Sequence, residues 1–328
     1  MHSKTFTTNK TSLIGEILKM SDTKPTKRKT AVQQRYEHNP DVQRWLRDQT
    51  LDTIGAKPEF DPTMLSGLRD RDWVLSSLKH FYDQNLIADV LYVAKSGKEA
   101  TVYCCAADQS TGLEYLAAKV YRPRMFRSLS NDALYRHGRE RRDKDGRVLR
   151  GSKRERGSLK QTERGRAAQV SSWIAYEFET QGLLYQAGAD VPRPLAQIGN
   201  AVLMEYVGDD EEVAPRLSDV DLAPEEAAPL FDALLRNVEL ALACDRIHGD
   251  LSAYNVLYWQ GAATIIDFAQ AVDPRHNDEL YALLERDIDR LYRYFARYGV
   301  VADPGALAAD MWTRYLVGSC QQFNAKRR

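Results

Sequence analysis

His248-Gly-Asp-Leu-Ser-Ala-Tyr-Asn255 and Ile265-Ile-Asp-Phe268 are the two stretches that decide the fold of this chain. They place a carboxylate at Asp250, a side-chain amide at Asn255, and a second carboxylate, Asp267, at the end of an apolar strand. Phosphoryl transfer from a metal-bound nucleotide needs such a set: one aspartate receives or orients the nucleophile, and an asparagine and an aspartate hold the divalent ions. The first motif alone occurs by chance in long chains, but together the two stretches favour a kinase-like active site.

The chemistry of Mg²⁺ explains why these residue types occur together. Mg²⁺ prefers octahedral oxygen ligands and usually takes one or two protein carboxylates, phosphate oxygens and waters. Asn255 offers a neutral oxygen and Asp267 a charged one, which leaves Asp250 to face the acceptor as a general base or as an orienting group. Singly, each residue has an ordinary explanation as a turn cap, an Asx-turn or a strand end. These ordinary explanations do not account for all three residues at this spacing.

Strands expected in a nucleotide-binding lobe precede these motifs. Residues Val90–Tyr103 predict two strands and a tight turn at Gly97, from their β-branched and aromatic residues. Residues Leu116–Tyr121 predict a third strand that carries Lys119 between apolar neighbours, as in the V-A-I-K element of kinases. We expect Lys119 to bridge the α- and β-phosphates of a nucleotide.

A lysine in such a strand needs a partner, because a buried charge must be compensated. Glu177, in the predicted helix Ser172–Ala187, is the natural candidate. The alternative, a lysine that reaches solvent and an exposed glutamate, stays open at this point.

The departures from ordinary protein kinases are equally informative. The turn has one glycine, Gly97, so the phosphate cover depends on Ser96, Lys98 and backbone N–H groups. Gly249 replaces the arginine of H-R-D, the residue that reads a phosphorylated activation loop. No A-P-E motif follows Asp267, and the sixty-one residues that remain are too few for a full peptide-docking lobe.

These features resemble the RIO kinase family, over roughly residues 70–300. The resemblance rests on Ser96-Gly-Lys-Glu-Ala-Thr-Val-Tyr103, Ala118-Lys-Val-Tyr121, Met204-Glu-Tyr-Val-Gly208, the His248–Asn255 motif and Ile265-Ile-Asp-Phe-Ala-Gln270. It implies an α+β, two-lobed protein-kinase-like fold with a small antiparallel β N-lobe that carries a helix, and a trimmed helical C-lobe. The implied form is the short, bacterial-like one without a winged-helix domain.

The resemblance also implies roles for individual residues. The adenine of ATP would meet the backbone of Glu205 and Val207, with Met204 at the gate. Asp250 would be the catalytic aspartate, with Asn255 and Asp267 as ligands of Mg²⁺ or Mn²⁺. Ser252 stands where many protein kinases have a lysine.

A second catalytic mode is also implied by the resemblance. Some RIO proteins look more like ATPases that pass through an aspartyl-phosphate on the metal-binding aspartate, which here is Asp267. The sequence does not separate the two modes, because both use the same residues, including Lys119. The expected function is an ATP- and Mg²⁺-dependent serine/threonine kinase, an ATPase, or both.

Two rival functions remain. A small-molecule phosphotransferase of the aminoglycoside or choline kinase type also carries H-G-D-x-x-x-x-N and Ile-Asp-Phe, but lacks Ser-Gly-Lys-Glu-Ala. A nucleotide-sensing module without turnover is disfavoured by the complete set of catalytic residues. Binding of ATP without release of its γ-phosphate would identify such a module.

The formal net charge of zero hides a strong asymmetry. Residues 121–170 hold sixteen Lys or Arg against six Asp or Glu, whereas residues 205–232 hold ten acids and one base. The basic stretch lies where RIO proteins have a flexible insertion. Its charge predicts either a loop that binds RNA or an acidic partner, or simply a solvated loop. The resemblance adds possible association with the ribosome. The protein substrate does not follow from the sequence.

The domain boundaries follow from these marks. We predict a polar, disordered tail (1–60), an N-terminal helical extension (61–89), the kinase N-lobe (90–207) with a basic flexible insertion (122–170), and the helical C-lobe (208–328). Helices are expected over Asp70–Leu86, after an aspartate cap, over Pro224–Arg246, over Leu280–Phe295 and from Pro304 onward.

The cysteines and the N-terminal residues indicate the compartment. The four cysteines form no C-x-x-C pair and read as thiols in a reducing environment. No signal peptide or membrane span is evident. We expect a cytoplasmic protein.

Overall fold

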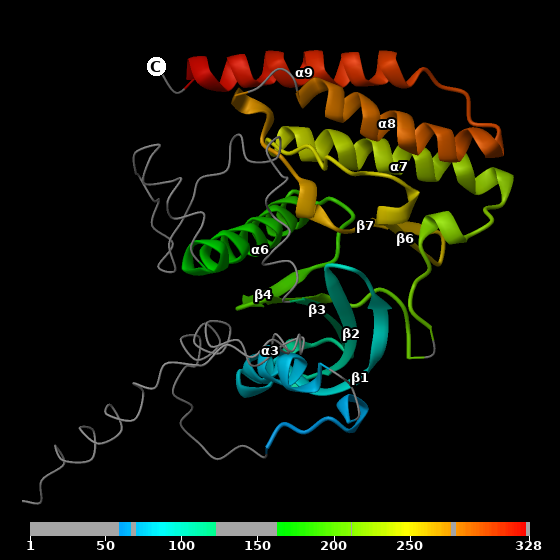
Figure 1. The fold of residues 1–328 in the computed structure, drawn as a ribbon. Coiled ribbons are helices and arrows are strands. Elements are labelled where there is room, and N and C mark those ends of the chain that lie inside the picture. The colour runs from blue at the N-terminus through cyan, green and yellow to red at the C-terminus, as the bar shows by residue number, and fades with distance from the viewer. Residues whose placement is uncertain (1–58, 67–69, 123–162, 211, 277–279, 326–328) are drawn as a thin grey trace, which may run out of the picture. The chain divides into compact units, whose positions relative to one another are not determined.

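The computed structural model describes residues 59–66, 70–122, 163–210, 212–276 and 280–325 (Figure 1). All of them belong to one unit of the chain, residues 36–328. Most of the predicted tail (1–60) and most of the basic insertion (122–170) lie outside the described residues. The domain boundaries therefore stay predictions.

Five antiparallel strands form the N-terminal sheet. They are β1 (Ile87–Ser96), β2 (Ala100–Ala107), β3 (Tyr115–Tyr121), β4 (Pro194–Ile198) and β5 (Ala201–Glu205), in the order β1-β2-β3-β5-β4. Lys119 therefore lies on the central strand, opposite Val102 on one side and Val202 on the other. We did not predict β4. It is short, half-buried along its length and begins with a proline, as an edge strand permits.

Helix α3 (Arg71–Asp83) covers one face of this sheet, near β1 in Figure 1. Its apolar stripe is buried against Ile87 and Leu116 of the sheet, and the Trp73 indole N–H donates to the Tyr121 carbonyl over 3.1 Å. Asp70 takes the N-cap position, but its side chain makes no capping hydrogen bond. The helix and the N-cap position of Asp70 are therefore as predicted, but the capping hydrogen bond from its side chain is not formed.

Helix α6 (Glu163–Gln186) begins nine residues earlier than predicted. Its first turns lie within the segment that we assigned to the basic insertion (122–170). Once the packed part of a helix exists, each further residue adds one hydrogen bond with no new nucleation cost. The apolar pattern marks only the packed part, around the buried Ile174 and Leu184.

The C-terminal lobe consists of α7 (Pro224–Ala243), α8 (Tyr281–Phe295) and α9 (Pro304–Ala325), which lie side by side in Figure 1. A two-stranded sheet, β6 (Val256–Trp259) and β7 (Ala262–Ile265), lies between these helices and the N-terminal sheet. Helix α7 ends three residues before the predicted Arg246, because Asp245 adopts a left-handed φ of 56°. None of the described helices is long and apolar enough to cross a membrane.

Candidate active site

Three charged residues from three distant parts of the chain meet at the centre of the site. The Lys119 Nζ lies 2.6 Å from Glu177 Oε1 and 2.9 Å from Asp267 Oδ1. Strand β3 supplies the lysine, α6 the glutamate, and the segment after β7 the aspartate. The side chains of Lys119 and Glu177 are 14% and 4% exposed, whereas that of Asp267 is 45% exposed. The predicted Lys119–Glu177 pair is therefore present, and the alternative of a solvent-facing glutamate is wrong.

The charges of this cluster support one another. Burial disfavours the charged lysine, but the carboxylates of Asp267 and Glu177 outweigh it and raise the pKa of Lys119 well above its usual value. The lysine in turn lowers the pKa of Asp267. Burial raises the pKa of Glu177, and this rise is opposed by Lys119 and by the Tyr121 hydroxyl, which donates to Glu177 Oε2. Lys119 and Asp267 thus favour each other's charged form, whereas burial and the neighbouring Asp267 work against the charge of Glu177.

Asp250 and Asn255 are fixed by short backbone contacts. The Asn255 Nδ2 donates to the Asp250 carbonyl over 2.8 Å, and the Asn255 N–H donates to the Ser252 carbonyl over 2.9 Å. The Ile266 N–H donates to the Asn255 carbonyl, also over 2.9 Å. This last bond places Asn255 beside the residue that precedes Asp267. The structure thus brings the two sequence motifs together.

The backbone of Asp267 adopts an uncommon conformation. Its φ of 69° and ψ of 72° lie in the left-handed region, which costs a non-glycine residue on the order of 1–3 kcal/mol. Such conformations cluster at functional sites, where the surrounding structure imposes them. Here the bend turns the carboxylate toward Lys119.

The residues that converge here fit a divalent metal ion. Asn255 uses its amide nitrogen for Asp250, which leaves its amide oxygen as a donor atom. Asp267 is half-exposed; one of its oxygens lies 2.9 Å from the Lys119 Nζ, and its carboxylate also accepts a hydrogen bond from the Ala269 N–H. A carboxylate has about four lone-pair sites, so these two contacts leave room for a metal ion. One neutral and one anionic oxygen, open to waters and phosphates, suit Mg²⁺ or Mn²⁺.

The turn between β1 and β2 contains the three residues that were predicted to cover the phosphates, Ser96, Gly97 and Lys98. The Gly97 N–H closes it by donating to the Ala100 carbonyl over 2.9 Å, and a Cβ at Gly97 would lie 3.1 Å from that oxygen. The Arg122 guanidinium donates to Ser96 Oγ over 2.8 Å. Lys98 is exposed at the tip. The turn is thus narrow, with its charged side chain exposed to solvent.

The linker between the lobes contains the residues predicted to meet adenine. Met204, at the end of β5, packs against the buried Cys104, Ala117 and Tyr206. The Glu205 N–H donates to the Arg193 carbonyl, and the Val207 carbonyl accepts from Ala214. These bonds hold the linker backbone in place. Ser252 is half-buried at the start of the catalytic loop, and no contact joins it to the Lys119 cluster in the described part of the chain.

Helix α8 supplies three contacts to the catalytic loop that we did not predict. The Asp287 Oδ2 accepts from the Gly249 N–H over 2.7 Å, the Arg286 guanidinium donates to the Gly249 carbonyl, and the Arg290 Nη1 lies 2.7 Å from Asp250 Oδ1. Burial raises the pKa of Asp287. A signal for Asp287 did exist, because this charged residue interrupts the apolar stripe of α8 at Leu284, Ile288 and Leu291. Nothing in the sequence marks Arg290.

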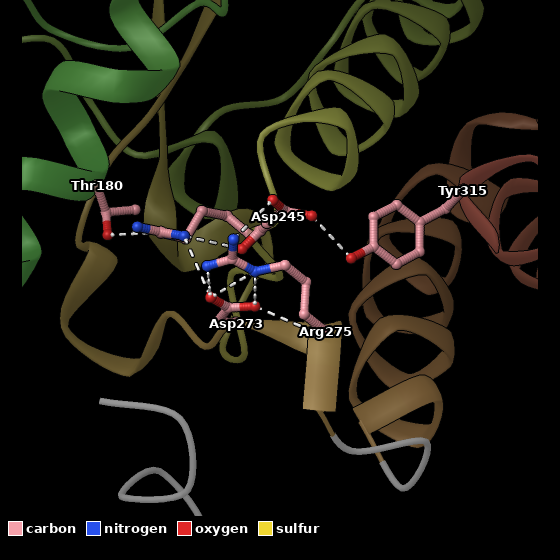
Figure 2. A network of polar contacts seen from close by, with 6 residues as sticks. Thr180, Asp245, Asp273, Arg275 and Tyr315 are labelled. Carbon is pink, nitrogen blue, oxygen red and sulfur yellow. Dashed lines mark hydrogen bonds and ion pairs between the residues drawn. The ribbon is translucent and has the colours of Figure 1, made fainter. Parts of the chain in front are cut away.

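A polar network lies beside the site (Figure 2) and consists of Thr180, Asp245, Arg246, Asp273, Arg275 and Tyr315. The buried Arg246 donates to Thr180 Oγ1 over 3.2 Å and lies 4.0 Å from Asp273 Oδ2. Arg275 pairs with Asp273 and lies 3.4 Å from Asp245. The Tyr315 hydroxyl, from α9, donates to Asp245 over 2.8 Å. The network thus joins α6, one turn beyond Glu177, to the segment after Asp267 and to α9.

Comparison with known proteins identifies relatives of this chain. Serine/threonine-protein kinase rio1 of Schizosaccharomyces pombe is 26% identical over 252 residues, which cover 74% of this chain and 45% of that protein. RIO-type serine/threonine-protein kinase Rio1 of Haloferax volcanii is 35% identical over 140 residues, or 42% of this chain and 47% of that protein. The chain spans less than half of the length of these two relatives.

Solved structures support the predicted fold. The Rio2 kinase-ADP/Mg²⁺-phosphoaspartate complex from Chaetomium thermophilum matches with a TM-score of 0.50 at 21% identity, over 72% of this chain and 64% of that chain. The two-lobed, kinase-like α+β fold is thereby confirmed.

The family is shown by a model of the RIO domain, which matches residues 101–306. The matched region includes Lys119, Glu177, Asp250, Asn255 and Asp267, and it covers more than half of the chain. This protein belongs to the RIO domain family.

Proposed function

We propose that this protein is an ATP- and Mg²⁺-dependent serine/threonine protein kinase of the RIO type, an ATPase, or both. The observation that carries the proposal is the meeting of Lys119, Glu177 and Asp267 beside a loop that holds Asp250 and Asn255. No simpler role explains a buried lysine with two carboxylates next to a second, half-exposed aspartate. The named relatives are serine/threonine kinases, which agrees with the proposal.

Each residue has a distinct part in the proposed reaction. Lys119, held by Glu177, binds the α- and β-phosphates of ATP. Asn255 and Asp267 hold Mg²⁺, which when bound neutralises part of the phosphate charge. Asp250 accepts the proton of the substrate hydroxyl while the oxygen of that hydroxyl forms a bond to the γ-phosphorus. The bond between the γ-phosphorus and the bridging oxygen breaks, and ADP leaves.

The remaining nucleotide contacts come from the turn and the linker. Ser96, Gly97 and Lys98 cover the phosphates, and the narrow turn brings backbone N–H groups close to them. Met204 borders the adenine, which meets the backbone of Glu205 and Val207. Ser252 completes the cofactor-binding set at the start of the catalytic loop.

Asp267 is the proposed nucleophile of the ATPase mode. A carboxylate can attack phosphorus and form an acyl-phosphate that water then hydrolyses. The Chaetomium thermophilum Rio2 structure is described as a phosphoaspartate complex, which makes this mode reasonable here. A phosphorylated intermediate that hydroxylamine cleaves would support the ATPase mode, whereas an acid-stable phosphoserine or phosphothreonine product would support the kinase mode.

The decisive experiment is Asp250→Ala, assayed for release or transfer of the γ-phosphate from radiolabelled ATP. We expect turnover to fall by about 10²–10⁴-fold, the usual contribution of general acid–base catalysis, with ATP affinity retained. Asp221→Asn, an exposed aspartate outside the site, serves as the control. If the Asp250→Ala variant kept most of its activity, Asp250 would not be the group that accepts the hydroxyl proton. ATP binding by the unchanged protein without any turnover would instead support a nucleotide-sensing module.

The cellular setting is also a proposal. The three described cysteines are free thiols, which suits the reducing cytoplasm. Association with RNA or the ribosome through residues 122–170 concerns a segment that lies almost entirely outside the described residues, so it stays a sequence-based prediction. To test this prediction, the Asp267→Ala variant is purified from a lysate of the cells that naturally make the protein, and the protein or RNA bound to it is identified.

A further inference from the structure

The ion pair between Arg290 and Asp250 is the least expected feature of the site. Arg290 lies on α8, forty residues after Asp250, and its Nη1 is 2.7 Å from the Asp250 Oδ1. The two side chains are 39% and 52% exposed. The neighbouring acid Asp289 pairs with Arg293 over 2.9 Å, so it does not compete for Arg290.

Stability does not explain this contact. Exposed ion pairs contribute about 0–1 kcal/mol, because water screens the charges and ordering two long side chains costs entropy. The two other contacts from α8, made by Arg286 and Asp287, already hold the backbone of Gly249. Arg290 instead reaches the one carboxylate that faces the acceptor.

The charge of the catalytic loop gives Arg290 a purpose. From His248 to Asn255 the loop contains no lysine or arginine, and Gly249 and Ser252 are both uncharged. Without Arg290, the Asp250 carboxylate would have no direct cationic partner in the described part of the chain, because Arg286 bonds to the Gly249 carbonyl instead. A cation beside this carboxylate reduces its repulsion of the phosphates of a nucleotide, and the structure provides it from a different element.

We propose that Arg290 is the positioning residue for the catalytic carboxylate: it holds Oδ1 of Asp250, offsets its charge, and leaves Oδ2 to accept the hydroxyl proton. This inference rests on the proposed function of the site. Among the described residues, the one hydrogen-bond partner of Asp250 Oδ2 is the Asn255 Nδ2 at 3.4 Å, which is too long for a strong hydrogen bond. Because Arg290 pairs with Oδ1 of Asp250, Oδ2 is the oxygen that is left to face the acceptor hydroxyl.

The test compares Arg290→Ala, Arg290→Lys and Arg293→Ala in the full chain. Arg293 lies on the same helix, is 75% exposed and pairs only with Asp289 in the described part of the chain, so it is a matched control. We expect Arg290→Ala to lower kcat by about 10- to 100-fold, because small displacements of a catalytic group have effects of that size. KM for ATP should stay within about twofold, since no contact joins Arg290 to the residues assigned to ATP binding in the described part of the chain.

The lysine variant separates positioning from simple packing. Lysine restores the charge but not the planar fork of arginine, so Arg290→Lys should recover part of kcat. The thermal midpoints of all three variants should match that of the unchanged protein. An unchanged kcat in Arg290→Ala, or a rise in KM for ATP with kcat retained, would overturn the inference while the unchanged protein still turns over ATP. If the unchanged protein shows no turnover, the proposed function fails, and this inference fails with it.

Discussion

Two ion pairs of the site invite comparison: Lys119–Glu177 and Arg290–Asp250. Both join a basic residue to an acid over about the same distance, 2.6 and 2.7 Å. The first pair is buried, with side chains 14% and 4% exposed, and the second is open to water, at 39% and 52%. We therefore expect the first pair to contribute to folding as well as to catalysis, and the second to contribute to catalysis almost alone.

The difference lies in solvation. A buried charge has lost its hydration, so removing its partner leaves it uncompensated in a medium where charges interact strongly. An exposed charge regains water when its partner is lost. The Arg246–Asp273 pair, with side chains 9% and 10% exposed but 4.0 Å apart, lies between these cases.

The largest effect on stability is expected from Glu177→Ala. Breaking a buried pair typically costs about 3–5 kcal/mol, and because Lys119 keeps Asp267 we expect a value near the lower limit. Urea unfolding measures it, with Glu179→Ala, an exposed glutamate on the same helix, as the control. A loss below about 1 kcal/mol would mean that the buried pair behaves like the exposed one.

A smaller, pH-dependent effect is expected from Asp273→Asn. Burial disfavours the charge of Asp273, but its hydrogen bonds and ion pair with Arg275, helped by Arg246, outweigh it and lower its pKa. A carboxylate with a lowered native pKa stabilises the fold above its unfolded pKa, near about 4, and this contribution is lost as the pH falls through the native value.

The amide should therefore cost about 2 kcal/mol at pH 7, the scale of a hydrogen bond to a charged group, and less at pH 3. Unfolding free energies measured between pH 3 and pH 7 check this, with Asp221→Asn as the exposed counterpart. Equal losses at both pH values would show that the charge of Asp273 contributes nothing.

The smallest effect on stability is expected from the exposed pair. Arg290→Ala should lower the free energy of unfolding by less than about 1 kcal/mol, and Arg293→Ala by less than about 0.5 kcal/mol. Urea unfolding of the two variants beside Glu177→Ala completes the series. A loss for Arg290→Ala as large as that for Glu177→Ala would end the distinction drawn between the two pairs.

Local patterns allowed the main elements to be predicted. Periodicity and helix-end signals, which act over a few residues, predicted the strand that carries Lys119 and the helix that carries Glu177. They also predicted helices α3, α7, α8 and α9. Strand β4 and the first turns of α6 escaped prediction. Strand β4 is a short edge strand in which apolar and polar residues do not alternate. The first turns of α6 have no apolar stripe.

The sequence by itself determined which acids, amide and lysine are candidates for a phosphoryl-transfer site, because their motifs stand at the spacing that such a site needs. It also indicated Glu177 as a partner for Lys119, since a buried lysine requires an acid nearby, but the structure was needed to exclude a solvent-facing glutamate. Only the tertiary structure decided the role of α8, from which Asp287 and Arg290 reach a loop about forty residues away. Such contacts depend on how helices pack, and a half-exposed arginine leaves no trace in hydrophobic periodicity.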